Sequence, residues 1–429
     1  MDSNQNRNVA PTPPMGWNSW DCYAATVTEA QLMNNAQYMK DHLLAHGWNY
    51  IVCDIQWSEP GAGTGEWEYR PMARLDMDEW GRLIPAENRF PSSAGGKGFK
   101  PIADKIHGMG LKFGIHLMRG IPRQAAYERT PILGTHYTAD QIANPFSVCK
   151  WNSDMYGVDH TKPGAQEYYD SLFALYASWD VDFVKIDDIC NTNLHKETPY
   201  SAKHEIEMIR RAMDKCGRPM VLSLSPGPAV IEEAWHLKKH AEMWRMTDDF
   251  WDHWPLLLDM FRRCEVWQSH VAPGSWPDCD MLPLGHIGIG HKRPRYTNFT
   301  HHEQMTMMNL WCIFRSPLMM GGEMNDSDEW TLKLMTNDEV IAVNQAGSAP
   351  RQIVRENGYA IWVSDAPDGG LNLAIFNTSD HQKAVTCPAD VLPQGQTIRD
   401  LWARENIGET NGDISVELAA HASVLYKIS

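Results

Sequence analysis

The stretch that decides the fold is Val181-Asp-Phe-Val-Lys-Ile-Asp-Asp-Ile-Cys190, in which an apolar run stops at a lysine and two carboxylates. A short β-branched run of this kind is typical of a parallel strand that is buried on both faces. Ligands and catalytic groups bind at the carboxyl end of such strands. Lys185 and Asp187 share one face of the strand, because side chains alternate with a period of two. The lysine keeps the carboxylate ionised, as a nucleophile requires, although a structural ion pair explains the pattern equally well.

Seven further strand-like runs alternate with amphipathic helical patterns on both sides of this stretch. The runs are Met15–Trp20, Tyr50–Asp54, Leu111–Leu117, Met220–Ser225, Met243–Met246, Ser275–Leu282 and Pro317–Met320. The helical patterns are Thr28–His46, Gly98–Met109, Pro163–Trp179, Ala202–Cys216, Ile231–His240, Pro255–Trp267, His302–Phe314 and Asp328–Asn344, with Thr28 and Asp328 as N-caps. Eight strand–helix units predict a closed (β/α)8 barrel over residues 9–345. An open doubly wound sheet is the alternative, but no GxGxxG motif follows the first strand.

Three segments depart from this alternation. Residues 58–97 and 119–156 follow the second and third strands without a clear period, and loops of this length are usually functional or disordered. After residue 346, short alternating strands are separated by Asn-Gly, Asp-Gly-Gly and Pro, which predicts an antiparallel β-sandwich domain over residues 346–429. We expect this domain to pack against the barrel, and a carbohydrate-binding module is a second interpretation.

Composition limits the partners and the compartment. The 38 basic and 54 acidic residues give a formal charge of −16, which argues against nucleic acid or an anionic membrane as a partner. No apolar run reaches the ~20 residues of a membrane span, and the first residues lack the pattern of a signal peptide. A cytoplasmic location is therefore expected unless a signal was removed. Self-association into a homo-oligomer is plausible.

If the barrel closes, polar residues at the strand ends converge on one pocket. They are Trp17, Trp20, Asp54, His116, Lys185, Asp187, Ser225, Arg245, Asp249, Asp278 and Asp280. Two carboxylates on different loops, one near a lysine and one near an arginine, suit glycoside hydrolysis. Each aspartate alone is explained as well by helix capping or a structural ion pair. Asp278 and Asp280 lack a histidine at metal-ligand spacing, and the nine cysteines lack CxxC spacing, so we expect no metal.

Six motifs, in order along nearly the whole chain, resemble glycoside hydrolase family 27, the family of α-galactosidases and α-N-acetylgalactosaminidases. They are Pro13-Pro-Met-Gly-Trp-Asn-Ser-Trp20, Gly47-Trp-Asn-Tyr-Ile-Val-Cys-Asp54, Val184-Lys-Ile-Asp187, Arg245-Met-Thr-Asp-Asp249, Trp276-Pro-Asp-Cys-Asp-Met-Leu282, and Ser316-Pro-Leu-Met-Met-Gly321 with Asn337-Asp-Glu-Val-Ile-Ala-Val-Asn-Gln345. The resemblance implies a (β/α)8 barrel with an antiparallel C-terminal domain. It implies no metal or organic cofactor.

The resemblance also assigns roles by position. Asp187 matches the nucleophile, and Asp249 matches the acid/base, because the Arg-x-x-x-Asp spacing from Arg245 selects it over Asp248. The remaining matches concern substrate binding: Lys185 and Asp54 match residues that hold sugar hydroxyls, Trp17 resembles the aromatic wall, and His116 stands where the family usually has tyrosine. Arg245 and Asp278, at strand ends of the same pocket, are further candidates for substrate binding.

One departure from the family concerns the sugar that is bound. The family has Asp-Asp at the end of the second strand, where the second aspartate binds the 6-hydroxyl of galactose, but here the pair is Asp54-Ile55. An isoleucine leaves a buried hydroxyl unpaired, at a cost of about 1–3 kcal/mol. β-L-Arabinopyranose has the stereochemistry of α-D-galactose without C6. Ile55 therefore favours a β-L-arabinopyranosidase.

Two further departures leave alternatives open. The family glutamate that reads the 2-hydroxyl appears here as Ser225, which leaves room near C2 as in the N-acetylgalactosamine branch. The family disulfide implied between Cys149 and Cys190 is in doubt, because Cys190 is shifted by one residue. The predicted function is a retaining exo-glycosidase for β-L-arabinopyranosyl groups. The alternatives are an α-galactosidase or α-N-acetylgalactosaminidase and, more remotely, a sugar-binding protein without catalysis.

Overall fold

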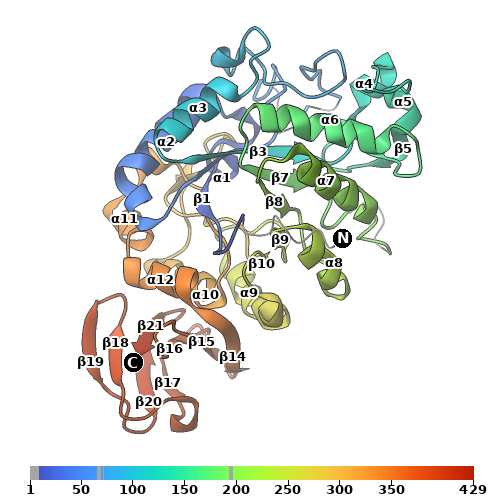
Figure 1. Ribbon diagram of the computed structural model, residues 1–429. Coiled ribbons are helices and arrows are strands. Elements are labelled where there is room, and N and C mark those ends of the chain that lie inside the picture. The colour runs from blue at the N-terminus through green and yellow to red at the C-terminus, as the bar shows by residue number, and fades with distance from the viewer. Residues whose placement is uncertain (1–8, 65–68, 71, 193–196) are drawn as a thin grey trace.

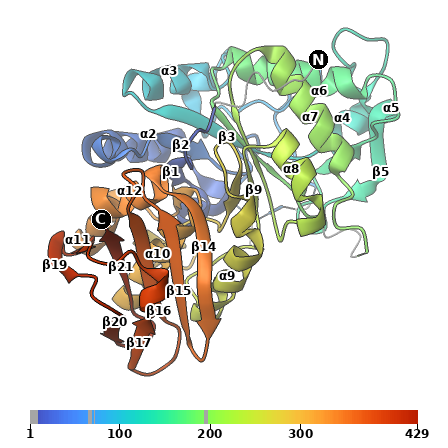
Figure 2. The same ribbon diagram turned by 60° about the horizontal axis from the view of Figure 1, so that its bottom comes forward.

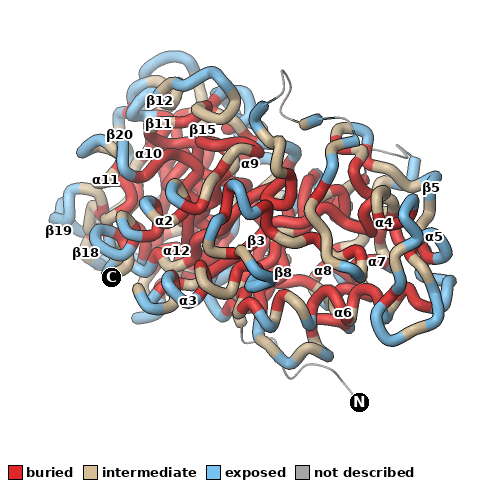
Figure 3. Tube along the Cα trace, turned by 90° about the horizontal axis from the view of Figure 1, so that it is seen from above, coloured by how far each residue is buried: buried red, intermediate tan, exposed pale blue. Residues whose placement is uncertain are grey.

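The structure, a computed structural model, describes residues 9–64, 69–70, 72–192 and 197–429 (Figure 1). Its central parallel sheet has the strand order β10-β9-β8-β7-β3-β2-β1-β13. The strands are β1 (Met15–Asn18), β2 (Tyr50–Cys53), β3 (Lys112–Met118), β7 (Phe183–Asp187), β8 (Val221–Leu224), β9 (Met243–Arg245), β10 (Trp276–Asp278) and β13 (Leu318–Met320). Each of them overlaps one of the predicted runs. Figure 3 shows that buried residues run along these strands and the helices around them.

The two edge strands of this sheet are joined beyond the end of β10. The amide of Leu282 donates to the carbonyl of Met319 at 2.8 Å, and the amide of Gly321 donates to the carbonyl of Leu282 at 2.9 Å. These bonds form a parallel bridge between Leu282 and Met320. The predicted closed (β/α)8 barrel is confirmed, and the open doubly wound alternative is wrong.

Helices surround the barrel (Figure 1). They are α1 (Trp20–Tyr23), α2 (Glu29–Tyr38), α3 (Lys100–Gly108), α6 (Ala165–Ser178), α7 (Lys203–Cys216), α8 (Ala234–His240), α9 (Trp254–Trp267), α10 (His301–Phe314), α11 (Glu329–Met335) and α12 (Asp338–Ala346). The predicted N-caps are confirmed, since Thr28 accepts from the Gln31 amide and Asp328 from the Thr331 amide. None of the helices in the described ranges is long and apolar enough to cross a membrane.

Two predicted helices differ from the observed ones for local reasons. The first continues from α2 as a π turn over Met39–Leu43 and a 3-10 turn over Leu44–His46, and it ends at Gly47 in the left-handed region. The last is two helices, because Asn337 accepts from the amides of Glu339 and Val340 and so caps a new helix.

The insertion after β3 is ordered, not the aperiodic loop that its sequence indicates. It contains β4 (Ile121–Pro122), α4 (Arg123–Glu128), α5 (Ala139–Ile142), β5 (Ala143–Val148) and β6 (Met155–Val158). The strands form an antiparallel sheet in the order β4-β6-β5. Two short strands after β10, β11 (His286–Ile287) and β12 (Arg295–Tyr296), pair with each other. These segments follow the carboxyl ends of barrel strands, and they position loop residues over that end.

The C-terminal strands form the predicted antiparallel sandwich (Figure 2). They are β14 (Ser348–Glu356), β15 (Tyr359–Asp365), β16 (Leu371–Asn377), β17 (Lys383–Cys387), β18 (Thr397–Asp400), β19 (Glu405–Glu409), β20 (Ile414–Leu418) and β21 (Ser423–Ile428). Six pair in the order β14-β15-β16-β21-β18-β19, and β17 pairs with β20. Buried Trp362 and Phe376 join the core of the barrel, with ring centroids 6.2 Å from Phe314 and 4.9 Å from Phe261, respectively. The sandwich therefore packs on the barrel through an apolar interface.

Candidate active site

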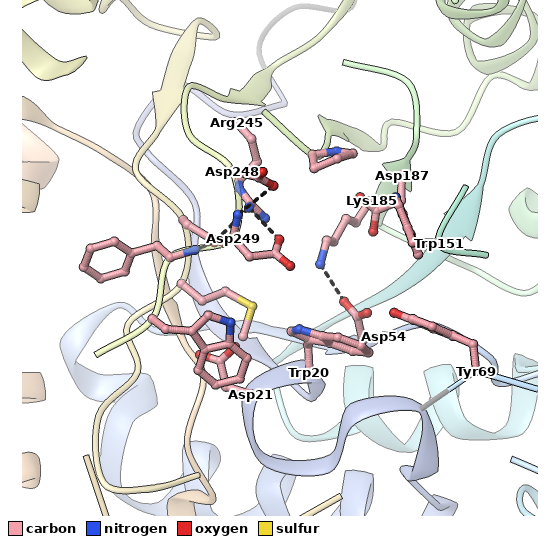
Figure 4. A pocket seen from close by; sticks show the side chains of 15 residues that line it. Trp20, Asp21, Asp54, Tyr69, Trp151, Lys185, Asp187, Arg245, Asp248 and Asp249 are labelled. Atoms are coloured by element: carbon pink, nitrogen blue, oxygen red, sulfur yellow. Dashed lines mark hydrogen bonds and ion pairs between the residues drawn. The ribbon is translucent and has the colours of Figure 1, made fainter. Parts of the chain in front are cut away.

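A cavity of about 310 Å³ lies at the carboxyl ends of the barrel strands (Figure 4). This size falls in the range of small-molecule binding sites. It is lined by Trp20, Asp21, Asp54, Tyr69, Trp151, Lys185, Asp187, Pro226, Arg245, Asp248, Asp249, Phe250, Trp251, Asp280 and Met281. Carboxylates, cations and aromatic rings thus face one space, a combination that suits the hydroxyls and C–H faces of a sugar.

Asp187 ends β7, and two side chains contact the two oxygens of its carboxylate. His116 Nε2 lies 2.6 Å from Asp187 Oδ2, and the Ser225 hydroxyl donates to Oδ1. Burial raises the pKa of Asp187, but the hydrogen bond from His116 and the charge of Lys185 outweigh burial and hold the pKa well below its usual range. The carboxylate is therefore ionised and fixed in orientation, as a nucleophile must be.

Lys185 and Asp54 form a second charged pair beside Asp187. The ammonium of Lys185 lies 2.9 Å from Asp54 Oδ2, which also accepts from Asn18 Nδ2 at 2.8 Å. The other oxygen of Asp54 accepts from the amide of Ile55 at 2.8 Å. Burial raises the pKa of Asp54, and the charges of Lys185 and His116 lower it by more. The pair presents a fixed cation and a fixed anion to the hydroxyls of a bound sugar.

Asp249 faces the same cavity from the loop that follows β9. Arg245 ends β9, and its Nη2 lies 2.9 Å from Asp249 Oδ1 and 3.0 Å from Asp280 Oδ2. The side chain of Asp249 is 58% exposed, whereas that of Asp187 is 13% exposed. Water can therefore reach the carboxylate of Asp249, while Asp187 is largely shielded from it. Asp248 lines the same cavity and accepts from the amide of Asp249 at 3.0 Å.

Comparisons with known proteins place this geometry in a family. A solved β-L-arabinopyranosidase of family GH27 from Geobacillus stearothermophilus is 55% identical, with a TM-score of 0.96, and the match covers 100% of this chain and 98% of that one. The chain belongs to glycoside hydrolase family 27. A putative α-N-acetylgalactosaminidase from Bacillus halodurans is 52% identical with a TM-score of 0.88, over 99% of both chains.

More distant relatives of this family 27 enzyme support the same assignment. The α-galactosidase of Cyamopsis tetragonoloba is 28% identical over 98% of this chain and 87% of its own length. The profile described as alpha galactosidase A matches residues 160–346, and that of the alpha galactosidase C-terminal beta sandwich domain matches residues 356–428. The protein is a hydrolase of glycosidic bonds that acts on carbohydrate substrates.

The aromatic wall of the family 27 site is formed by residues other than Trp17. Trp17 is fully buried and donates its indole N–H to the carbonyl of Gly322 at 2.8 Å, so the prediction that it lines the cavity is wrong. Trp20 lines the cavity instead, stacked on Tyr69 with ring centroids 5.9 Å apart, and Tyr69 contacts Trp151 at 5.4 Å. Trp17 lies inside β1, which ends at Asn18, whereas Trp20 lies beyond the strand as the first residue of α1.

Besides Trp17 and Asp278, three predicted substrate-binding residues lie outside the lining of this cavity: Ile55, His116 and Ser225. His116 and Ser225 are buried behind Asp187 and hold its carboxylate. Ile55 and His116 line a separate cavity of about 20 Å³, large enough for about one water molecule. Asp154 lines this small cavity too, and one of its buried oxygens has no hydrogen-bond partner.

Sequence reasoning missed seven lining residues: Asp21, Tyr69, Trp151, Pro226, Phe250, Trp251 and Met281. Tyr69 and Trp151 belong to the two long segments that have no period. Their only signal is that long segments after barrel strands often carry site residues. Asp21 follows Trp20 directly and was within reach of the strand-end argument.

The cysteines and possible metal ligands lie outside this chemistry. All nine cysteines are described and free, including Cys149 and Cys190, so the structure does not contain the implied disulfide. Within the described ranges, one group of three potential ligands, Asp104, His107 and Asp180, has ligand atoms within 4.8 Å of one another. None of the three lines the cavity, and Lys100 already pairs with Asp180 at 3.1 Å.

Asp278 was predicted to bind substrate, but its neighbour Asp280 is the residue that lines the cavity. Asp280 lines the cavity, while Asp278 is buried outside the lining and accepts from the amide of Asp280 at 2.9 Å. Burial, with the neighbouring charge of Asp280, raises the pKa of Asp278 to about 7. Burial also raises the pKa of Asp280, to about 6, against the opposing charge of Arg245. These carboxyl groups bind protons near neutral pH.

The raised pKa of Asp278 makes the stability of the enzyme depend on pH. The folded protein binds this proton more tightly than the unfolded chain, so the stabilising contribution is lost as pH rises from about 4 through about 7. Asp278→Asn keeps an acceptor for the amide and removes the ionisation. We expect the melting temperature of the variant, relative to wild type, to be a few degrees higher at pH 8 than at pH 5. Equal differences at the two pH values in scanning calorimetry would contradict this assignment.

Proposed function

We propose that this family 27 enzyme is a retaining exo-glycosidase that releases terminal β-L-arabinopyranosyl groups. One observation carries the mechanism: Asp187 at the end of β7 and Asp249 in the loop after β9 line one cavity of sugar size, which Lys185 and Arg245 line as well. Paired carboxylates on the two sides of a glycosidic bond are the machinery of glycoside hydrolysis.

In the first step, Asp187 attacks the anomeric carbon as the bond to the leaving oxygen breaks. Its depressed pKa keeps it ionised, and its contacts with His116 and Ser225 hold it in place. Asp249, held by Arg245, donates a proton to the leaving oxygen, so the aglycone departs as an alcohol. The product of this step is a covalent glycosyl-enzyme.

In the second step, Asp249 removes a proton from water, and that water attacks the same carbon. The ester to Asp187 breaks, and both carboxylates return to their starting states. The 58% exposure of Asp249 gives water access to the base, while Lys185 and Asp54 hold sugar hydroxyls. Two inversions at one carbon retain the configuration.

Two observations support arabinopyranose as the substrate: the similarity to a known arabinopyranosidase and the identity of residue 55. The Geobacillus stearothermophilus relative is a β-L-arabinopyranosidase, and a variant of it is known in complex with arabinose. Ile55 follows Asp54, at the position where the family carries the carboxylate that accepts the 6-hydroxyl of galactose. Asp54 lines the sugar cavity, and Ile55 lines the small neighbouring cavity. A sugar without C6 leaves no hydroxyl unpaired there.

A second candidate is α-galactosidase or α-N-acetylgalactosaminidase activity. It is favoured by the Bacillus halodurans relative. Ser225, at the position of the family glutamate near C2, is buried behind Asp187 and lies outside the cavity lining, so it adds no support. Initial rates on p-nitrophenyl β-L-arabinopyranoside, α-D-galactopyranoside and the N-acetyl analogue separate the candidates. We expect the arabinopyranoside to have the highest kcat/KM. Faster turnover of either hexoside would overturn the substrate assignment.

Replacing Ile55 tests its part in this preference. In Ile55→Asp the new carboxylate is expected to raise the ratio of galactoside to arabinopyranoside kcat/KM by about 5- to 100-fold, the equivalent of one satisfied buried hydroxyl. Ile55→Leu is the matched control, since it changes shape without adding an acceptor, and it should leave the ratio within about threefold. An unchanged ratio in Ile55→Asp would mean that position 55 does not read C6.

A further inference from the structure

Asp188 follows the proposed nucleophile directly but lies in a different environment. It is buried, with φ of +56°, and it does not line the cavity. This left-handed conformation is one that aspartate tolerates better than most residues. The chain thus turns sharply after Asp187, and the turn must be held if the carboxylate of Asp187 is to keep its place.

Arg119, one residue beyond β3, contacts the peptide groups on both sides of this turn. Its backbone amide donates to the carbonyl of Asp187 at 3.1 Å, and its Nε donates to the carbonyl of Asp188. Its Nη2 forms an ion pair with Asp188 Oδ2 at 2.8 Å. One buried side chain therefore fixes the backbone immediately after the proposed nucleophile.

Glu205 on α7 holds Arg119 from the other side. Its Oε1 accepts from Arg119 Nη1 at 3.0 Å, and its Oε2 accepts from the Tyr169 hydroxyl at 2.6 Å and from the Val158 amide at 3.1 Å. Gly157 leaves the space this requires, because a Cβ there would lie 2.6 Å from Arg119 Nη1. The guanidinium is therefore locked between α7, the insertion sheet and the end of β7.

Burying three charged groups is costly unless they are paired, and these contacts pair all three. Arg119, Asp188 and Glu205 are each at most 5% exposed. The cluster joins segments far apart in sequence at the single point where the chain leaves Asp187. A catalytic group displaced by about 1 Å loses about 100-fold in rate.

We propose that Arg119, locked by Asp188 and Glu205, is a positioning residue that sets the placement of the Asp187 carboxylate. The inference rests on the proposed role of Asp187 as nucleophile. Arg119 does not touch the substrate cavity, so its effect falls on the chemical step and not on binding. The fork geometry of the guanidinium, not its charge alone, carries the effect, because a lysine cannot donate in three directions from the same positions.

Arg119→Lys tests this with Arg315→Lys as its matched control. Arg315 is also buried and also holds backbone carbonyls, those of Asn344 and Gln345, but it precedes β13 at the opposite end of the barrel. We expect Arg119→Lys to lower kcat by about 10- to 100-fold with KM within about threefold. Arg315→Lys should lower the melting temperature and keep kcat within about twofold.

Equal kcat in wild type and Arg119→Lys, or equal losses in Arg119→Lys and Arg315→Lys, would overturn the proposal. If Arg119→Lys does not fold, Asp188→Asn replaces it, because this variant removes one ion pair and leaves Arg119 paired with Glu205. It should lower kcat by about 3- to 10-fold at constant KM, and an unchanged kcat would overturn the proposal. Asp187→Asn, assayed in parallel, separates the two claims: if it stays active, the nucleophile is wrong, whereas its inactivity beside a fully active Arg119→Lys refutes this inference alone.

Discussion

Asp187→Asn is expected to lower kcat on p-nitrophenyl β-L-arabinopyranoside by on the order of 10⁴- to 10⁶-fold, because removing a nucleophile eliminates the covalent route. Asparagine has the shape of aspartate and retains one oxygen, which can accept from Ser225, while its NH2 group replaces the oxygen that faces His116. The fold should therefore persist. Steady-state kinetics and circular dichroism on the same preparation measure both expectations.

The loss of kcat in Asp187→Asn can be compared with the effect of replacing the neighbouring carboxylate of Asp54. Asp54 lines the same cavity but is paired with Lys185, so Asp54→Asn should weaken binding of the sugar and raise KM. A variant of Asp187 that keeps more than about one hundredth of wild-type kcat would contradict the nucleophile assignment.

Asp249→Ala is expected to lower kcat/KM by about 10²- to 10⁴-fold, the usual contribution of a general acid/base. The loss should be smaller with p-nitrophenol than with an alkyl alcohol as the leaving group, since p-nitrophenolate departs with little help from an acid. Because the side chain of Asp249 is 58% exposed, small anions can reach the space that it leaves. Sodium azide should then accelerate turnover and give a glycosyl azide of retained configuration.

Asp248 is the matched control for this prediction, as it is adjacent in the chain and lines the same cavity. Of these two aspartates, Asp249 is the one that Arg245 holds, at 2.9 Å. Asp248→Ala should lose far less activity and show no azide rescue. Rescue in Asp248→Ala and not in Asp249→Ala would exchange the two roles.

The barrel was predictable because its strands are short apolar runs that end in charge, as at Phe183–Asp187, and its helices have regular apolar faces. The sequence did not predict β19, because Glu405–Glu409 is polar and exposed along its whole length. Nor did it predict the two turns that follow α2, where the chain keeps a helical pattern but tightens toward Gly47.

The site was predictable where residues end strands. Asp54, Lys185, Asp187 and Arg245 all face the cavity, because parallel strands deliver their last side chains to one end of a barrel. Trp17 shows the limit of this argument, since it lies inside β1 and is fully buried, and of the two tryptophans only Trp20, the first residue of α1, lines the cavity. The strand-end argument could not predict residues on long loops, such as Tyr69 and Trp151, because their positions depend on tertiary packing and not on periodicity.

The central claim, that Asp187 attacks the sugar across a cavity shared with Asp249, is tested most directly by trapping the intermediate. A fluorinated arabinopyranosyl fluoride slows the second step more than the first, so the glycosyl-enzyme accumulates, and peptide mass spectrometry locates the label. We predict one glycosyl group per chain, esterified to Asp187. A label on any other residue, or full inactivation with no covalent label, would contradict the account.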